Sequence, residues 1–151
     1  MTIKYDFGSR SIKNLTTCSP DLQRILWRAI KITPNDFTVL CGLRDEEAQN
    51  EAYATGRSTK QWPHSVHNTE PSEAVDVAPW RISPVTGRGY IPWKDQGCFY
   101  ELAGVMKVAA ILEGEEFRYG GDWDRDGLTQ DQNFFDLGHF ERMACWNSCY
   151  N

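Results

Sequence analysis

The chain has 151 residues, of which 40% are hydrophobic and 13% aromatic, and its formal net charge is −5. This length and composition predict a single domain, residues 1–151, with a substantial hydrophobic core. We expect the protein to be a monomer. Without a lysine- or arginine-rich block or an apolar run long enough to cross a bilayer, the chain is expected to bind no nucleic acid and to insert into no membrane.

The N-terminal part is expected to contain one helix and one strand. Residues 1–6 lack the apolar segment of a secretory signal, so we expect synthesis in the cytoplasm and release by another route. Ser19 and Pro20 are residue types favoured at a helix start, and apolar residues then recur at helical spacing as far as Thr33. β-branched and apolar side chains predict a strand over residues 37–41.

Helical and extended patterns follow one another along the rest of the chain. The predicted elements are a helix at 46–54 opened by Asp45, a polar loop at 57–63, a strand at 74–78, a hairpin within 81–92, a helix at 99–112, and strands at 117–119 and around Phe140. Together they predict an α+β fold, in which a small, mainly antiparallel sheet has helices packed to one side.

The five cysteines are an odd number and lack the spacing of a zinc finger. We therefore expect free thiols, as in a reducing compartment, rather than a disulfide framework. Cys145 and Cys149 lie four residues apart, which leaves open a local disulfide or a metal-binding pair.

The three histidines lie in two short patches, residues 64–67 and His139. Between these patches Asp76 interrupts an apolar run, where a buried carboxylate needs a strong partner. His67, Asp76 and His139 are candidate ligands of one zinc ion in a cleft on the sheet, because two imidazoles and a carboxylate leave one coordination position for water. His64 competes with His67 for this role.

A zinc peptidase also needs a carboxylate beside the attacking water, to accept its proton. Asp136 lies three residues before His139, and Gly138 allows a tight bend between them. We therefore expect Asp136 to act as the general base. Glu141, two residues after His139, would share its face in a strand and could orient its imidazole from outside the metal site.

Three motifs carry a resemblance to a known family: Ser65-Val66-His67, Ala74-Val75-Asp76 and Asp136-Leu137-Gly138-His139. They resemble the Ser-x-His, Ala-x-Asp and Asp-x-x-His signature of the zinc peptidoglycan peptidases. That family includes D-Ala-D-Ala carboxypeptidases and single-domain phage endolysins that are L-alanyl-D-glutamate endopeptidases. Further matches, which extend the resemblance over residues 37–141, are Gly42-Leu43-Arg44, Gln49, Gly56-Arg57-Ser58 and the endolysin-like stretch 117–123.

The resemblance implies a set of active-site residues. They are His67, Asp76 and His139 as zinc ligands, Asp136 as general base, and Arg44, Ser65 and Gln49 as substrate contacts. A guanidinium suits a peptide stem rich in carboxylates, because it binds them bidentately. The interval between the first zinc ligand and Asp76 is two residues longer than is usual in the family, and residues 71–73 fill it. We expect this to change the shape of the cleft rather than the metal site.

A second cation site, for calcium, is predicted in the acidic segment 122–131. Its candidate ligands are Asp122, Asp124, Asp126 and Asp131. The first three fall at positions 1, 3 and 5 of an EF-hand-type loop, with Gly127 at position 6. Position 12 is Asn133 rather than glutamate, so either Asp131 supplies the missing oxygen or the site is weak. A solvated acidic turn is the alternative interpretation.

The sequence thus predicts a zinc metallopeptidase of the phage endolysin type, which hydrolyses the L-alanyl-D-glutamate bond of peptidoglycan stem peptides during host cell lysis. Such a protein is made in the host cytoplasm and acts on the wall, in the periplasm, after release. The alternatives are a D-Ala-D-Ala carboxypeptidase of the same family and a non-catalytic, calcium-dependent cell-wall-binding module. A glycosidase with two catalytic carboxylates is disfavoured, because it would not need the histidines.

Overall fold

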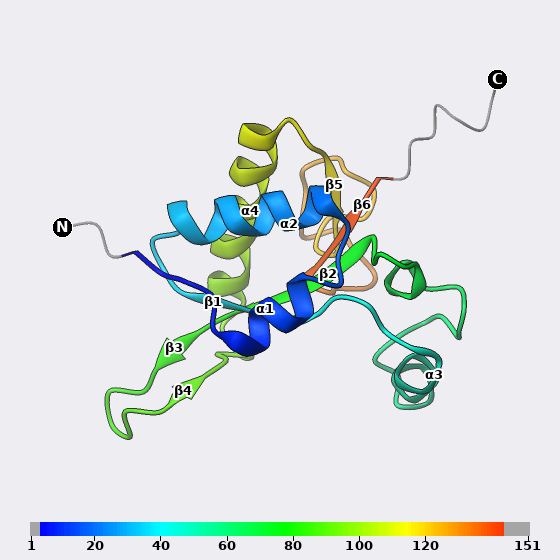
Figure 1. Ribbon diagram of the computed structural model, residues 1–151, viewed down its shortest axis with the longest axis horizontal. Coiled ribbons are helices and arrows are strands. Elements are labelled where there is room, and N and C mark those ends of the chain that lie inside the picture. The colour runs from blue at the N-terminus through cyan, green and yellow to red at the C-terminus, as the bar shows by residue number, and fades with distance from the viewer. Residues whose placement is uncertain (1–3, 144–151) are drawn as a thin grey trace.

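The computed structural model describes residues 4–143, and these form an α+β fold (Figure 1). The elements in chain order are α1 (Ser9–Leu15), α2 (Pro20–Ile32), β1 (Phe37–Cys41), α3 (Glu46–Ala54), the 3-10 turn η1 (Val66–Asn68), β2 (Ala74–Pro79), β3 (Arg81–Ile82), β4 (Gly89–Tyr90), α4 (Gln96–Glu113), β5 (Phe117–Tyr119) and β6 (His139–Arg142). The fold class predicted from the sequence is confirmed.

A four-stranded sheet with the order β1-β2-β6-β5 forms the centre of the molecule. All neighbouring strands of this sheet pair antiparallel. β6, from the end of the described chain, lies between β2 and β5. Along β2 every side chain is buried except that of Asp76, which is partly exposed. β3 and β4 pair separately, as the hairpin predicted within residues 81–92.

Helices α2 and α4 pack against each other, and α4 contacts β2 (Figure 1). The apolar stripe predicted on α2 is buried in this layer: Leu22, Ile25, Leu26, Ala29 and Ile30. Burying a side chain of the size of leucine or isoleucine contributes about 1.5–3 kcal/mol. This layer therefore fixes β2, and through β2 the position of Asp76. In Figure 1, α3 is set apart from these two helices.

Local capping determines where the helices begin and end. Asp45 caps α3, since its Oδ1 accepts a hydrogen bond from the Ala48 amide at 2.9 Å. Gly114 ends α4 in the left-handed region, with φ of 70°, which glycine adopts without steric cost. Ser19 occupies the N-cap position of α2, as predicted, but its side chain makes no capping hydrogen bond.

Two short helical elements were not predicted. α1 has 7 residues and η1 has 3, too few for an apolar periodicity to show in the sequence. α1 is attached to the edge strand by side chains: Ser11 and Thr38 share a hydrogen bond between hydroxyls at 2.9 Å, and Asn14 donates to the Val39 carbonyl at 2.9 Å.

Within residues 4–143, no helix has both the length and the hydropathy needed to span a bilayer. Cys18, Cys41 and Cys98 are free thiols, as predicted, whereas Cys145 and Cys149 lie outside the described residues.

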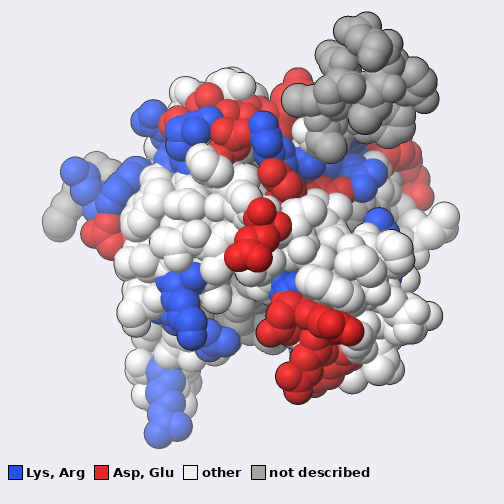
Figure 2. All heavy atoms as spheres, turned by 45° about the vertical axis from the view of Figure 1, so that its right-hand side comes forward, with Lys and Arg blue, Asp and Glu red and all other residues white. Residues whose placement is uncertain are grey.

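On the face drawn in Figure 2, basic side chains are interspersed with acidic and uncharged ones, and acidic side chains gather at the lower right, where α3 lies.

Candidate active site

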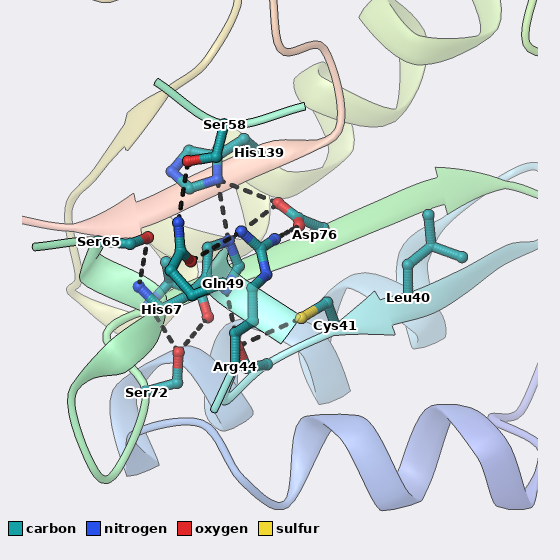
Figure 3. Close-up of polar contacts among 12 residues, drawn as sticks. Leu40, Cys41, Arg44, Gln49, Ser58, Ser65, His67, Ser72, Asp76 and His139 are labelled. Atoms are coloured by element: carbon teal, nitrogen blue, oxygen red, sulfur yellow. Dashed lines mark hydrogen bonds and ion pairs between the residues drawn. The ribbon is translucent and has the colours of Figure 1, made fainter. Parts of the chain in front are cut away.

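Asp76 and His139 lie next to each other on two neighbouring strands. The register of β2 and β6 pairs the two residues directly, and opposed residues of an antiparallel pair point to the same face. Asp76 Oδ1 is 3.0 Å from His139 Nδ1. The sheet thus presents a carboxylate and an imidazole side by side, as Figure 3 shows.

His67 reaches the same point from η1. Its Nδ1 lies 2.7 Å from the carbonyl oxygen of Gly42 and donates to it, so Nε2 is the nitrogen directed toward the pair. This Nε2 is 3.2 Å from Asp76 Oδ1 and 3.3 Å from His139 Nδ1. His67 is buried, whereas the competing candidate His64 is exposed. His67 is therefore the histidine that the fold brings to Asp76 and His139.

The three donor atoms form a triangle of a size that fits zinc. Its edges are 3.0, 3.2 and 3.3 Å. Two ligands at about 2.0–2.1 Å from a tetrahedral zinc ion are about 3.3 Å apart, and imidazole and carboxylate are ligand types found in catalytic zinc sites. One neighbour was not foreseen: the Cys41 thiol lies within 4.8 Å of donor atoms of His67 and Asp76.

A capping box fixes the turn that carries His67. Ser65 Oγ accepts a hydrogen bond from the His67 amide at 3.3 Å, and Asn68 Oδ1 accepts one from the Ser65 amide at 3.0 Å. Asn68 also donates to the Arg44 carbonyl at 3.0 Å, which joins the turn to the segment after β1. Ser65 therefore positions His67, and it also lines the cleft in front of the site.

Asp136 lies beside this group, with a carboxylate oxygen within 4.8 Å of donor atoms of Asp76 and His139. Backbone bonds hold it there: its amide donates to the Gly120 carbonyl at 2.8 Å, and the His139 amide donates to its carbonyl at 3.0 Å. Two glycines allow this close packing. A Cβ on Gly120 would lie 2.1 Å from the Asp136 carbonyl oxygen, and one on Gly138 would lie 2.4 Å from a backbone oxygen of β2.

The charges of the group depend on one another. Burial lowers the pKa of His67, but the Asp76 carboxylate outweighs burial and raises it to about 10. In the same way, hydrogen bonds to Asp76 and Glu141 raise the pKa of His139 to about 9 against the effect of burial. Burial favours the neutral form of Asp76, yet the two imidazoles hold its pKa below the usual range. Burial and the nearby Asp76 charge raise the pKa of Asp136 above its ordinary value.

Glu141 contacts the outer nitrogen of His139. Because Nδ1 faces Asp76, the His139 Nε2 points away from the donor triangle, and it lies 3.1 Å from Glu141 Oε2. Glu141 is buried, which raises the pKa of its carboxyl, but hydrogen bonds from His139 and Arg118 hold this pKa below its usual value. The structure thus places Glu141 in the outer position that its spacing from His139 suggested.

Arg44 and Gln49 form a hydrogen-bond network beside the donor triangle (Figure 3). Arg44 donates from Nη2 to Asp76 Oδ2 and from Nη1 to Gln49 Oε1, both at 3.1 Å. Gln49 in turn donates to Ser58 Oγ at 3.0 Å and to the Lys60 carbonyl at 2.6 Å. Gln49 is 0% exposed, so it supports Arg44 and the following loop instead of making the substrate contact expected from the sequence.

The site opens onto a cleft of about 890 Å³. Basic and aromatic side chains both line it: Arg44, Arg57, Lys60 and Arg118, and Trp93, Phe99, Trp123, Phe134 and Phe135. The residues of the longer interval lie elsewhere, since the Ser72 amide donates to the Thr17 carbonyl at 2.9 Å and the Ser19 amide to the Ser72 carbonyl at 2.8 Å. Residues 71–73 do not line the cleft, and Ser72 is bonded instead to the segment between α1 and α2.

The acidic segment brings three of its four candidate ligands together. Carboxylate oxygens of Asp122, Asp124 and Asp126 lie within 4.8 Å of one another. Asp122 is buried, and its Oδ1 has no hydrogen-bond partner among the described residues. Asp131 does not join this group: it is exposed and accepts a hydrogen bond from Gln132 Nε2 at 2.9 Å. The expectation that Asp131 supplies a further oxygen is not met by this arrangement.

Comparison with known proteins places these residues in a wider context. Residues 1–143 match the family model described as phage L-alanyl-D-glutamate peptidase. The chain is 32% identical over 143 residues to the L-alanyl-D-glutamate peptidase of Escherichia phage T5. The aligned region covers 92% of this chain and 98% of the phage T5 protein. Its fold resembles the crystal structure of the Serratia marcescens L-Ala D-Glu endopeptidase ChiX, with a TM-score of 0.69 and 27% sequence identity over 93% of this chain and 91% of that one.

Proposed function

The chain belongs to the family of phage L-alanyl-D-glutamate peptidases, and we propose that it hydrolyses this amide bond in peptidoglycan stem peptides with zinc held by His67, Asp76 and His139. The observation that carries the proposal is the convergence of these three side chains, two of which are 72 residues apart in the sequence. The donor types and the edges of their triangle support zinc as the metal.

Each polar residue of the site has a role in this reaction. When bound, zinc acidifies a water molecule to a pKa of about 7 and polarises a carbonyl oxygen. Asp136 accepts the proton of the attacking water and returns it to the leaving amine. Burial raises the pKa of Asp136, which makes its carboxylate a stronger proton acceptor than an exposed aspartate.

The substrate contacts we propose are Arg44 and Ser65, because both line the cleft beside the donor triangle. Arg44 has five N–H donors, and its bonds to Asp76 and Gln49 use two of them. The remaining donors can bind a carboxylate of the stem peptide or the oxygen of the scissile amide. The buried Gln49 acts indirectly, by holding the guanidinium in place.

In its biological setting, we propose that the protein is an endolysin. It would be made in the host cytoplasm, reach the cell wall in the periplasm at the time of lysis, and act as a monomer. The phage origin of the family and of the T5 relative supports the role as an endolysin.

Metal analysis of the purified protein, together with mass spectrometry of digested cell wall, tests the proposal. We expect one zinc per chain and wall fragments in which D-glutamate carries a new free amino group. Release of free D-alanine instead would identify a D-Ala-D-Ala carboxypeptidase. Binding to the wall without new amino groups would identify a non-catalytic module, and new reducing ends would indicate a glycosidase.

We further propose that Asp122, Asp124 and Asp126 bind calcium and so order the segment that leads to Asp136 and His139. The unpartnered Oδ1 of Asp122 supports this, because an unsatisfied buried carboxylate oxygen is costly and a cation would satisfy it. Calcium added to the zinc-loaded protein should raise its melting temperature, and the double variant Asp124→Asn/Asp126→Asn should lose that response. An unchanged melting temperature and activity on calcium addition would refute the site.

A further inference from the structure

His139 is held through both of its ring nitrogens. Nδ1 faces Asp76 Oδ1, and Nε2 lies 3.1 Å from Glu141 Oε2. A carboxylate that accepts from the outer N–H of an imidazole fixes its tautomer and leaves the inner nitrogen free to bind metal. The quality of His139 as a ligand therefore depends on where Glu141 is held.

Arg118 holds Glu141 from the neighbouring strand. The register of β5 and β6 pairs the two residues directly. Arg118 Nε donates to Glu141 Oε1 at 2.7 Å, and Nη2 donates to the same oxygen. Because Oε1 is occupied in this way, Oε2 is the oxygen that remains for His139. The Arg118 side chain is 38% exposed and that of Glu141 is 8% exposed, so the pair is shielded on the carboxylate side.

The indole ring of Trp123 lies next to both Arg118 and His139, the two residues that contact Glu141. The ring lies 5.3 Å from the Arg118 guanidinium carbon and 5.5 Å, between centroids, from the His139 imidazole. The indole is itself fixed, since Nε1 donates to the Phe134 carbonyl at 2.9 Å. A guanidinium over an indole face is attracted to it, by about 0.5–1 kcal/mol at exposed sites. Trp123 thereby limits the movement of Arg118 and of the imidazole together.

We propose that Arg118 and Trp123 are positioning residues of the metal site, which act on zinc through Glu141 and His139 without touching it. This inference rests on zinc binding as proposed above. It assigns a role to two residues that sequence reasoning noted only as parts of a family-like stretch. Their effect is on the orientation of one ligand, so it should be visible in zinc affinity as well as in turnover.

The sign of the effect separates this role from simple electrostatics. If Arg118 acted only through its charge, removing that charge near a cation site would strengthen zinc binding. If it positions Glu141, removing it should weaken zinc binding. Losing Glu141 itself, the outer partner of the ligand, would typically cost about 10–100-fold in affinity. Arg118→Ala, which leaves Glu141 in place but unheld, should therefore weaken zinc binding by up to about 10-fold, and Arg118→Lys should recover part of the loss through a single hydrogen bond.

Competition between the protein and a chromophoric zinc chelator measures this affinity. The matched control is Arg28→Ala, which removes another arginine–glutamate pair, Arg28 Nε to Glu113 Oε1 at 2.6 Å, located between α2 and α4. This control should bind zinc like the unmodified protein. Melting of the metal-free forms should show similar losses for the two alanine variants, which would exclude a general loss of folding as the cause.

Trp123 provides an independent test, because its removal leaves the charges unchanged. Trp123→Ala should weaken zinc binding and alter the visible absorption of the cobalt-substituted protein, while Trp123→Phe should retain more of both. Unchanged or tighter zinc binding in Arg118→Ala and Trp123→Ala would overturn the inference. If the unmodified protein itself bound no zinc, the proposed function would fail instead, so the two failures are distinguishable.

Discussion

Asp76 and His139 are directly opposed in the register of β2 and β6, and their facing atoms, Oδ1 and Nδ1, are 3.0 Å apart. This relationship is set by strand pairing, because a shift of one residue would turn one of the two side chains to the other face. The buried neighbours of Asp76 in β2 fix that pairing. Hydrophobic packing of the sheet thus determines the geometry of the metal site.

Replacing Asp76 should abolish tight zinc binding. Asp76→Ala removes one of the three donors and leaves the Arg44 guanidinium without its carboxylate partner. Since outer partners of metal ligands are worth about 10–100-fold in affinity, loss of an inner ligand should cost more than about 100-fold. Chelator competition measures the change, and retention of stoichiometric zinc at nanomolar concentration would contradict the assigned ligand set.

Asp136→Asn should separate chemistry from metal binding. The amide keeps the shape of the side chain but cannot accept the proton, so turnover should fall by about 100- to 10,000-fold while one zinc remains bound. Asp131→Asn, at an exposed aspartate outside the cleft, is the control and should leave turnover unchanged. A variant Asp136→Asn that cleaves stem peptides at the normal rate would remove Asp136 as the base.

Zinc binding should release protons at pH 7. Zinc needs neutral imidazoles, whereas in the metal-free protein carboxylates raise the pKa of His67 to about 10 and that of His139 to about 9. Zinc affinity should therefore increase as pH rises from 7 toward 9. The metal-free protein should behave in the opposite way: its stability from these protonated histidines is complete below about pH 6.5 and is lost as pH rises through their folded pKa values.

Calorimetry of zinc binding in two buffers with different enthalpies of ionisation measures the proton release. Urea unfolding of the metal-free protein at a series of pH values measures the stability change. A heat of binding that is independent of the buffer at pH 7 would show that the imidazoles are already neutral.

The contact between Gly120 and Asp136 predicts a marked difference between two glycine substitutions. Gly120→Ala would place a Cβ 2.1 Å from the Asp136 carbonyl oxygen, so the backbone must move, and we expect a loss of about 1–3 kcal/mol in the free energy of unfolding. Gly104→Ala, in α4 with open space around it, should instead stabilise the protein by about 0.5–1 kcal/mol. Equal effects of the two substitutions in urea unfolding would contradict the close packing of this loop.

Features with a local signal could be predicted from the sequence. The β-branched and apolar run at residues 37–41 predicted the bounds of β1, and Asp45 marked the start of α3 by its capping chemistry. The ligand set was suggested by residue type, because Asp76 is a carboxylate within an apolar strand and only three histidines are present. These are properties of single positions and their near neighbours.

Features that depend on pairing between distant segments could not be predicted. The role of Arg118 requires the register of β5 with β6, which the sequence does not specify. The resemblance implied Gln49 as a substrate contact, and nothing in its helix indicates that its side chain bonds to loop residues Ser58 and Lys60. The bonds of Ser72 to Thr17 and Ser19 likewise join segments far apart in the chain, so the sequence did not show where the longer interval lies.

X-ray absorption spectroscopy of the zinc-loaded protein tests the ligand set most directly. Two imidazoles, a carboxylate and a water molecule predict a shell of only nitrogen and oxygen atoms at about 2.0–2.1 Å, with the outer scattering of two imidazole rings. A sulfur atom at about 2.3 Å would show that Cys41, whose thiol lies within 4.8 Å of donor atoms of His67 and Asp76, is a ligand instead. That result, or a shell with no imidazole scattering, would contradict the account.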